Sequence, residues 1–266
     1  MEFKKNYHSH TARCGHARGR DEQYVLAAIE AGFETIGFSD HVILPDRSQP
    51  GMRGHPALLE GYIRSVQELK KKYEGRIEIL LAFECEWYGD RYASYYQDLL
   101  SKRGFDYLLL GQHCFLQRDH FTWHGDEDAP HPALVHYVDT VIDGLESGLF
   151  AYLCHPDLFM LWYPAWDEFA EEQSLRLIRR ANELHIPLEF NFGPSRSGAK
   201  NLPDRDDYKI YPYSKFWQLV AKEKASVILG VDAHQPSDYA KTDYAWALSF
   251  IKECGLKWEQ NLSFKK

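Results

Sequence analysis

The sequence predicts an α/β protein in which seven strand–helix pairs close into a barrel of the TIM type, and two observations support this prediction. Short apolar runs alternate with amphipathic segments, and the runs 79–83 and 227–231 are typical of strands buried on both faces of a parallel sheet. Every apolar run also ends close to a histidine, an acid or an amide. The carboxyl ends of barrel strands converge on one mouth, so these polar residues are expected to meet there.

The predicted elements alternate along the chain. We expect strands at residues 3–8, 34–38, 77–83, 106–111, 150–154, 186–190 and 226–231. We expect helices at residues 21–32, 57–73, 92–103, 132–147, 168–185, 213–224 and 237–253. Apolar residues within 57–73 have i, i+3, i+4 spacing, and Asp167 is placed to cap the helix at 168–185. Polar residues at all seven strand ends favour a closed barrel over the alternative, a doubly wound open sheet.

Composition indicates one domain, residues 1–266, and argues against nucleic acid and membranes as partners. The chain is 44% hydrophobic, which suffices for one large core, and its net charge of -8 gives no general attraction to nucleic acid or anionic membranes. No apolar run approaches the roughly 20 residues of a membrane span, and residues 1–6 show no apolar segment of a secretory signal. We therefore expect a cytoplasmic protein that acts on a small molecule, and make no prediction of oligomeric state.

The five cysteines are an odd number and include no C-x-x-C pair. They are expected to be small buried side chains in a reducing compartment. A thiolate metal ligand at Cys14 or Cys154 is the alternative.

Two short motifs at opposite ends of the chain point to metal binding. His8 and His10 are separated by one residue, and positions i and i+2 of an extended strand face the same side, so both imidazoles can reach one ion. Asp232 and His234 repeat this spacing on a strand that a closed barrel would place next to the first. Imidazole and carboxylate ligands in this arrangement indicate a divalent metal site.

Further candidate ligands close the intervening strands. Glu84 ends a buried strand, where an unpaired carboxylate would be costly and a metal ion would stabilise it; Glu86 is the alternative acid. His113 and His155 each follow an apolar strand, and His16 lies in a glycine-containing loop that folds over the mouth. Of the adjacent residues Asp40 and His41, which face opposite sides, we favour His41.

The remaining histidines are expected to be surface or structural residues. They are His55, His120, His124, His131, His136 and His185. The long polar segment 116–132 is expected to form a lid over the mouth.

As a set, these motifs resemble the polymerase-and-histidinol-phosphatase (PHP) superfamily. The set comprises H-x-H at 8–10, S-D-H at 39–41, an acid after the third strand, a strand-end histidine, C-H-P at 154–156 and D-x-H at 232–234. The resemblance implies a distorted seven-stranded (β/α)7 barrel and commonly a trinuclear metal centre. It implies one ion held by His8, His10, Glu84 and Asp232, a second bridged by Glu84 and held by His113 and His155, and a third held by His16, His41 and His234.

Within that superfamily the chain is most similar to stand-alone histidinol-phosphate phosphatases, in length, in S-D-H and in E-x-N at 189–191, which makes Asn191 a candidate for substrate binding. Those enzymes usually carry Arg or Lys shortly after C-H-x-D, thought to hold the substrate phosphate. Here residues 158–166 contain no basic side chain. Phosphate binding is therefore assigned to Arg196, in a Gly/Ser-rich loop, or to Arg53.

The favoured function is hydrolysis of a small phosphomonoester, with L-histidinol phosphate the first candidate and Asp232, His234 and Glu84 as catalytic residues. Two or three divalent ions would activate water and clamp the reacting oxygens, so no protein nucleophile is required. Mixed histidine and carboxylate ligands suit Zn, Mn or Fe. The alternatives are a phosphoesterase for nucleotides or oligonucleotide ends, an amidohydrolase on a related barrel, and a non-enzymatic metal-binding module.

Overall fold

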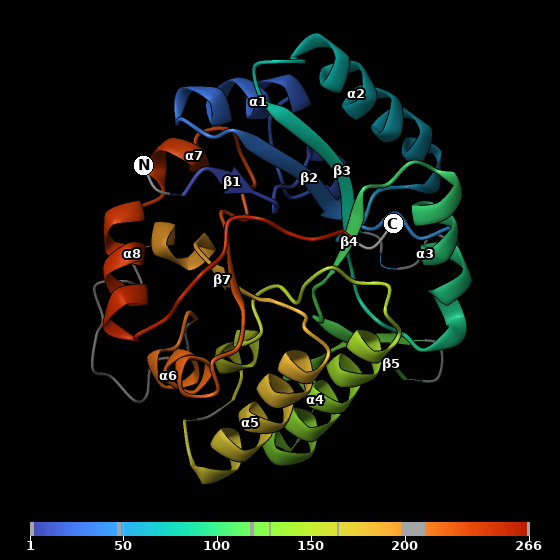
Figure 1. The fold of residues 1–266 in the computed structure, drawn as a ribbon. Helices are drawn as coiled ribbons and strands as arrows, with labels where there is room; N and C mark the ends of the chain where they lie inside the picture. The colour runs from blue at the N-terminus through green and yellow to red at the C-terminus, as the bar shows by residue number, and fades with distance from the viewer. Residues whose placement is uncertain are drawn as a thin grey trace.

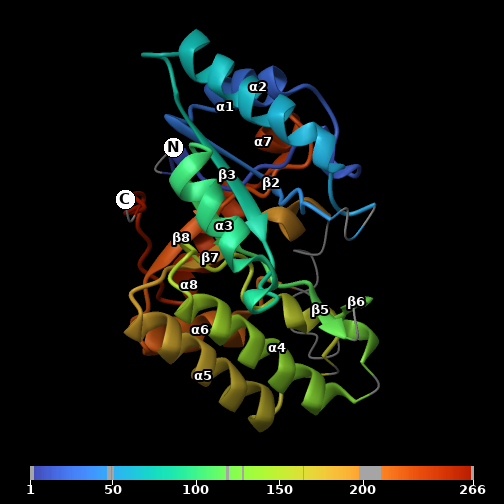
Figure 2. The ribbon, with the colours of Figure 1, turned by 90° about the vertical axis from the view of Figure 1, so that its right-hand side faces the viewer.

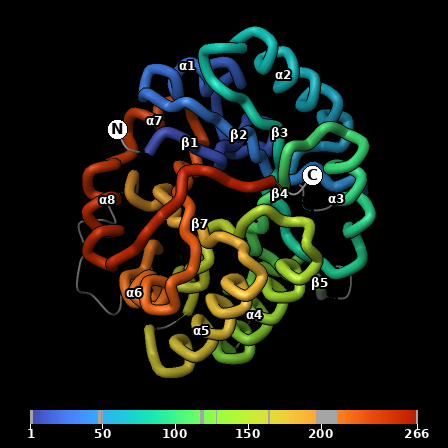
Figure 3. The backbone as a smooth tube through the Cα atoms, viewed as in Figure 1, coloured from blue at the N-terminus to red at the C-terminus, as the bar shows by residue number. Residues whose placement is uncertain are grey.

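Parallel strands lie at the centre of the molecule and helices surround them (Figures 1 and 3). The computed structural model describes residues 3–46, 49, 51–117, 120–127, 129–163, 165–197 and 211–264. Four parallel strands form one curled sheet in the order β1 (Lys5–Asn6), β2 (Thr35–His41), β3 (Glu78–Cys85) and β4 (Tyr107–Leu110). A second parallel pair consists of β7 (Leu188–Asn191) and β8 (Val227–Gly230).

The sheet register brings the ends of β2 and β3 together. His41 is paired with Glu84 across these two strands, so two predicted site residues are neighbours in the sheet. β2 and β3 are both longer than predicted, since they continue through the polar residues at their carboxyl ends. The mixed α/β class with a parallel sheet is therefore confirmed.

One predicted strand is wrong in the described structure. Residues 150–154 contribute only Leu153, which makes single parallel bridges to Leu110 and to Leu188. The backbone turns immediately afterwards, because His155 has a φ of 33° and a proline follows it. A further single bridge joins Ser9 to Ala233.

Six of the seven predicted helices each correspond to one observed helix. These are α1 (Asp21–Glu30), α2 (Leu59–Lys72), α3 (Asp90–Lys102), α4 (Pro130–Glu146), α5 (Glu168–Glu183) and α6 (Ser214–Lys222). The Asp167 side chain accepts a hydrogen bond from Ala170 N at 2.7 Å, which confirms the predicted cap of α5. Among the described residues, no helix is long and apolar enough to cross a membrane.

The predicted helix at 237–253 is wrong, because two helices occupy this range. α7 (Asp238–Lys241) ends at Thr242, whose ψ of 126° is extended, and α8 (Tyr244–Glu253) begins after Asp243. The Asp243 side chain accepts a hydrogen bond from Trp246 N at 3.0 Å and so caps the new helix. Apolar periodicity continues across this break and conceals it in the sequence.

The segment predicted as a lid overlaps an antiparallel hairpin of β5 (Cys114–Gln117) and β6 (His120–Trp123). Figure 2 shows the hairpin on the side of the molecule toward which β3 points. A short 3₁₀ turn, η3 (His124–Asp126), leads from it toward α4. The hairpin therefore stands beside the mouth formed by the strand ends.

The last described residues cover the opposite end of the strands. Glu259 N donates to Val227 O at 2.8 Å at the start of β8, and Leu262 N donates to the Tyr7 hydroxyl at 3.4 Å. The Phe264 ring stacks on Tyr107 with ring centroids 5.1 Å apart. Aromatic packing thus closes the amino ends of the strands, and the candidate site lies at the carboxyl ends.

The outer helices are held to the strands by apolar burial, which predicts a clear contrast between two leucines. Leu177 on α5 is fully buried in the core, whereas Leu26 on α1 is 46% exposed. Leu177→Ala should lower the free energy of unfolding by about 2–5 kcal/mol, because it leaves a cavity. Leu26→Ala should change it by no more than about 0.5 kcal/mol. Urea denaturation measures the free energy of unfolding of both variants, and equal decreases would contradict the burial of Leu177 in the core.

Candidate metal centre

Side chains from strand ends far apart in the sequence gather at one mouth. His8 and His10 follow β1, His41 and Glu84 end β2 and β3, and the other candidates follow later strands. Three overlapping groups have ligand atoms within 4.8 Å of one another: His8, His10 and Glu84; His41, Glu84 and His113; and His10, His41 and His234.

Glu84 lies at the centre of this cluster and faces histidines with both of its oxygens. Its Oε2 is 3.1 Å from His41 Nδ1, 3.4 Å from His10 Nε2 and 3.7 Å from His8 Nε2. Its Oε1 is 2.9 Å from His155 Nε2 and 3.7 Å from His113 Nε2. A carboxylate between two sets of imidazoles is suited to bridge two cations.

The first histidine is oriented by a second carboxylate. His8 Nδ1 lies 2.9 and 3.1 Å from the two oxygens of Glu189, so it is the nitrogen that carries the proton in neutral His8. His8 Nε2 then presents a lone pair to the centre, where it lies 3.2 Å from His10 Nε2. Two ring nitrogens and the nearby Glu84 and Asp232 oxygens thus converge on one small volume.

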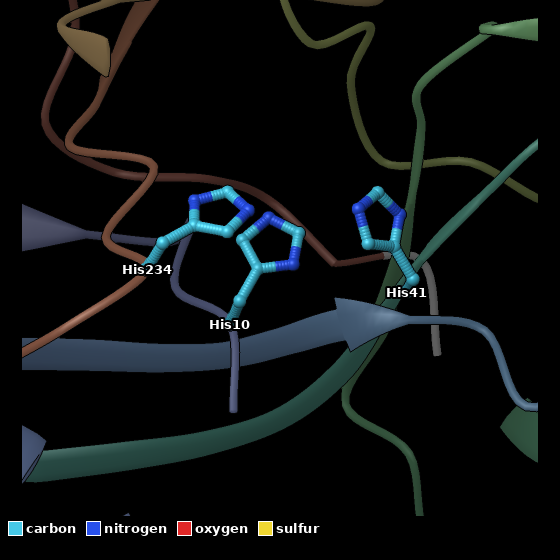
Figure 4. Close-up of side chains that lie close together, drawn as sticks. All are labelled: His10, His41 and His234. Carbon is cyan, nitrogen blue, oxygen red and sulfur yellow. The ribbon is translucent and has the colours of Figure 1, made fainter. Parts of the chain in front are cut away.

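His10, His41 and His234 form the second part of the mouth. Figure 4 shows the rings of His10 and His234 side by side, and they stack with centroids 4.0 Å apart. His41 lies at the end of β2, with its ring centroid 4.5 Å from that of His10. His16 is exposed, and its ring lies 5.1 Å from His41 and 5.0 Å from His234 between centroids. The loop that carries His16 therefore does fold over the mouth.

His113 is oriented by the acid that was considered as an alternative to Glu84. Glu86 accepts from His113 Nδ1 at 3.0 Å, which turns Nε2 of that ring toward Glu84. Glu86 is fully buried and is ion-paired with the Arg53 guanidinium. Arg53, which is 5% exposed, also donates to the Gln49 side chain. The structure thus places Arg53 behind a histidine, with Glu86 between them.

Asp232 and its neighbours are held in a specific backbone conformation. Asp232 has a φ of 51°, in the left-handed region that non-glycine residues seldom adopt and that is often found at functional sites. Arg196 supports it, because Nη2 donates to Asp232 O and Nη1 donates to Val231 O, both at 2.7 Å. Asn191 Nδ2 donates to Asp232 Oδ2 at 3.2 Å and to Glu189 Oε2 at 3.3 Å.

Several buried ligand atoms fit a cation, since they form no hydrogen bond within the described residues. They are Asp232 Oδ1, His10 Nδ1 and His41 Nδ1. Asp232 Oδ1 lies 3.1 Å from His10 Nε2 and 3.3 Å from His234 Nδ1. Buried polar atoms normally have partners, so this group fits divalent ions by its chemistry and by its unused lone pairs.

The pKa values of these residues show how strongly the carboxylates of the mouth favour positive charge. Burial lowers the pKa of His113 to about 3 and that of His234 to about 4, so both rings are neutral and keep a lone pair. Burial also tends to lower the pKa of His8, but Glu189 and Asp232 outweigh it and raise that pKa to about 10. Burial opposes ionisation of Asp232, yet His8 and His234 hold its pKa well below the usual range. The carboxylates therefore attract positive charge to this mouth.

Comparison with known families decides the identity of this fold. A family model described as the PHP domain matches residues 6–191, which is more than half of the chain. The chain belongs to the PHP domain family. The family assignment predicted from the sequence motifs is therefore confirmed.

Relatives of this PHP protein are histidinol-phosphatases. A probable histidinol-phosphatase of Deinococcus radiodurans is 25% identical over 255 residues, covering 93% of this chain and 92% of the relative. The histidinol-phosphatase of Bacillus subtilis is 25% identical over 284 residues, covering 94% and 99%. A structure of the Lactococcus lactis histidinol phosphate phosphatase, in complex with zinc, L-histidinol and phosphate, has a TM-score of 0.71 at 19% identity and covers 96% of this chain and 95% of that one.

The PHP chain also contains supporting residues that the sequence motifs did not assign. Glu189 was part of the noted E-x-N, but its contact with His8 was not predicted. Gly111 and Gly230 leave room for carboxylates, since a Cβ at either position would collide with Glu84 or Glu189 respectively. A glycine within a strand is a signal of such close approach. Burial raises the pKa of the Cys154 thiol, which donates to Glu84 Oε1 at 3.2 Å; its sulfur also lies in a group of possible metal ligands with His8 and Glu189.

Glu189→Gln should weaken metal binding without unfolding the protein. Gln keeps the size of the side chain but removes the charge that orients His8, and loss of such a partner typically costs about 10- to 100-fold in metal affinity. Competition with a chelator measures the affinity. Glu183→Gln is the control, because the Glu183 side chain is 63% exposed on α5. Equal affinities in both variants would show that Glu189 does not orient His8.

Proposed function

We propose that this PHP protein is a metal-dependent phosphatase that hydrolyses L-histidinol phosphate to L-histidinol and phosphate. The observation that carries the proposal is the position of Glu84 between two sets of histidines, in a mouth built from the strand ends. Relatives that align with more than nine-tenths of the chain are named histidinol-phosphatases, which supports this substrate.

We further propose that the strands form one distorted seven-stranded barrel within a single domain, residues 1–266. The bridges Leu110–Leu153, Leu153–Leu188 and Ser9–Ala233 support this proposal, because they link the four-stranded sheet to the β7–β8 pair at both ends. The fifth and first strands would then be reduced to short contacts. Such a ring explains how Asp232 reaches His8.

We propose that two or three divalent ions, Zn, Mn or Fe, are bound here. His8, His10, Glu84 and Asp232 would hold one, His113, His155 and Glu84 a second, and His16, His41 and His234 a third. The short distances within each of the first two groups support them best. When bound, such ions lower the pKa of water and neutralise charge on phosphoryl oxygens.

The residues of the chain supply proton transfer and orientation. Asp232 and His234, whose Oδ1 and Nδ1 lie 3.3 Å apart, are the residues that would relay a proton to the leaving alkoxide. The His234 side chain is 32% exposed, so it is the member of the pair that substrate can reach. Glu84 holds both sets of histidines in position, which makes it indispensable to the site.

Arg196 remains our choice for phosphate binding. A guanidinium has five N–H groups, and the hydrogen bonds to Val231 O, Asp232 O and Thr242 Oγ1 use three of them. Nε also lies 3.7 Å from Asp238 Oδ1, so among the described residues one N–H of Nη2 is left without a hydrogen-bond partner and is our choice for a phosphate oxygen. Asn191 contributes indirectly by holding that carboxylate. Arg53 is assigned to the support of Glu86 and His113, because its guanidinium is buried and ion-paired.

We propose a cytoplasmic location and a small phosphorylated substrate. All five cysteines are free thiols, four of them buried, as is usual in a reducing compartment.

Purified protein should contain about two or three divalent ions per chain and release phosphate from L-histidinol phosphate. Removal of the ions with a chelator should abolish release, and Zn, Mn or Fe should restore it, since the site relies on cations. Elemental analysis and a phosphate assay measure both. Faster hydrolysis of nucleoside monophosphates than of L-histidinol phosphate would show that the proposed substrate is wrong, and active protein without metal would refute the mechanism.

Glu84→Ala should reduce turnover far more than Lys222→Ala on α6.

Arg196→Ala should lower kcat/KM by about 10- to 1,000-fold, because one charge-assisted contact to phosphate is lost. If Arg196 binds phosphate, KM and the inhibition constant of inorganic phosphate both rise while metal content is kept. If it only supports Asp232, metal content falls and phosphate inhibition does not change. Arg179→Ala, an exposed position on α5, serves as the control.

A further inference from the structure

A second group of potential metal ligands lies beside the mouth, on the segment between the hairpin and α4. His124 is the first residue of η3, Glu127 is the first residue after η3, and His136 lies on α4. None of the three belongs to the centre described above. We propose that His124, Glu127 and His136 form a separate site for one borderline divalent cation such as zinc, and that this ion has a structural role.

The distances within this group suit a metal ion. Glu127 Oε1 lies 3.1 Å from His136 Nδ1 and 3.5 Å from His124 Nδ1. Ligands about 2.0–2.1 Å from a tetrahedral zinc ion are separated from one another by about 3.3 Å, which falls between these two values. The two imidazole rings stand at 71° to each other with centroids 5.3 Å apart, so each directs Nδ1 to the same carboxylate oxygen.

His124 provides an independent observation that points to a ligand. Its side chain is 1% exposed, and neither ring nitrogen has a hydrogen-bond partner within the described residues. Apolar rings surround it, among them Phe115, Tyr137 and Trp162. A buried imidazole without any partner is rare because its lone pair and its N–H are both left unsatisfied. A cation at Nδ1 would use the lone pair.

Solvent can reach the other two ligands. The His136 side chain is 42% exposed and that of Glu127 is 21% exposed, which gives an ion a route to the group and space for a water ligand. The acid lies between two histidines in space, and the three residues come from two different elements. A single ion would therefore fasten η3 to α4.

An ion at this second site would also affect the main centre, because the hairpin contacts His113. His124 N donates to His113 O at 3.2 Å, and the preceding Trp123 stacks on the His113 ring with centroids 6.1 Å apart. An ion bound by His124 would hold the end of the hairpin, and with it the Trp123 ring, against His113. The second site would thus order one wall of the mouth without touching substrate.

The test separates this site from the main centre by its metal content. Zinc bound per chain is measured after equilibrium dialysis against buffered zinc, for the wild type, Glu84→Ala, Glu84→Ala/His136→Asn and Glu84→Ala/His131→Asn. His131 is the matched control, because it lies on the same helix and its side chain is 56% exposed. We expect the Glu84→Ala protein and its His131→Asn derivative to bind the same amount of zinc, and the His136→Asn derivative to bind one equivalent less.

A second readout covers the case in which a variant folds poorly. Cobalt bound to the Glu84→Ala protein should show the visible absorption of a tetrahedral ion, and Glu127→Gln in that background should remove the contribution of one ion while circular dichroism is unchanged. Equal zinc in the His136→Asn and His131→Asn proteins, or unchanged cobalt absorption in Glu127→Gln, would overturn the second site. Neither result bears on phosphate release, so failure here is distinct from failure of the proposed phosphatase.

Discussion

The buried charge of Glu84 is the constraint on which the rest of the mouth depends. A carboxylate that is 2% exposed is unstable as an anion unless positive or hydrogen-donating groups surround it. Burial by itself would raise the pKa of Glu84, but His41 and His113 reverse this and hold the pKa well below the usual range. Gly111 and the Cys154 thiol also accommodate the Glu84 carboxylate, because the glycine leaves space for it and the thiol donates to it.

Two layers of polar groups surround this carboxylate: the histidines that face it, and the groups behind them that orient these histidines. Outer carboxylates bind the Nδ1 atoms of His8 and His113, and these contacts leave the Nε2 atoms facing inward. Arg53 compensates the charge of Glu86 from behind. Arg196 compensates no inner carboxylate directly and instead binds the backbone that carries Asp232. The outer carboxylates thus fix the rings so that their Nε2 atoms face the centre, which is the orientation that a bound cation requires.

The inner layer could be predicted from the sequence because short-range geometry determines it. The spacing of His8 and His10, repeated at Asp232 and His234, places both members of a pair on one face of an extended chain. The outer layer could not be predicted, since Arg53 meets Glu86 and Glu189 meets His8 through long-range packing that no local pattern encodes. The same limit explains the errors in the fold. The break at Thr242 and Asp243 depends on a side-chain cap, and the 150–154 segment is shortened by the unusual backbone of His155.

The bridge between Ser9 and Ala233 has a consequence for the order of events during synthesis. His10 N donates to Ala233 O at 2.8 Å, so the first histidine pair is fixed by a segment that the ribosome produces more than two hundred residues later. Until that segment emerges, His8 and His10 lack their aspartate, and Ser9 lacks its bridge to Ala233. A nascent chain therefore presents these histidines without the carboxylate that completes their ligand set. Assembly of the centre is in this sense a late step, because Asp232 and His234 are translated only after β8.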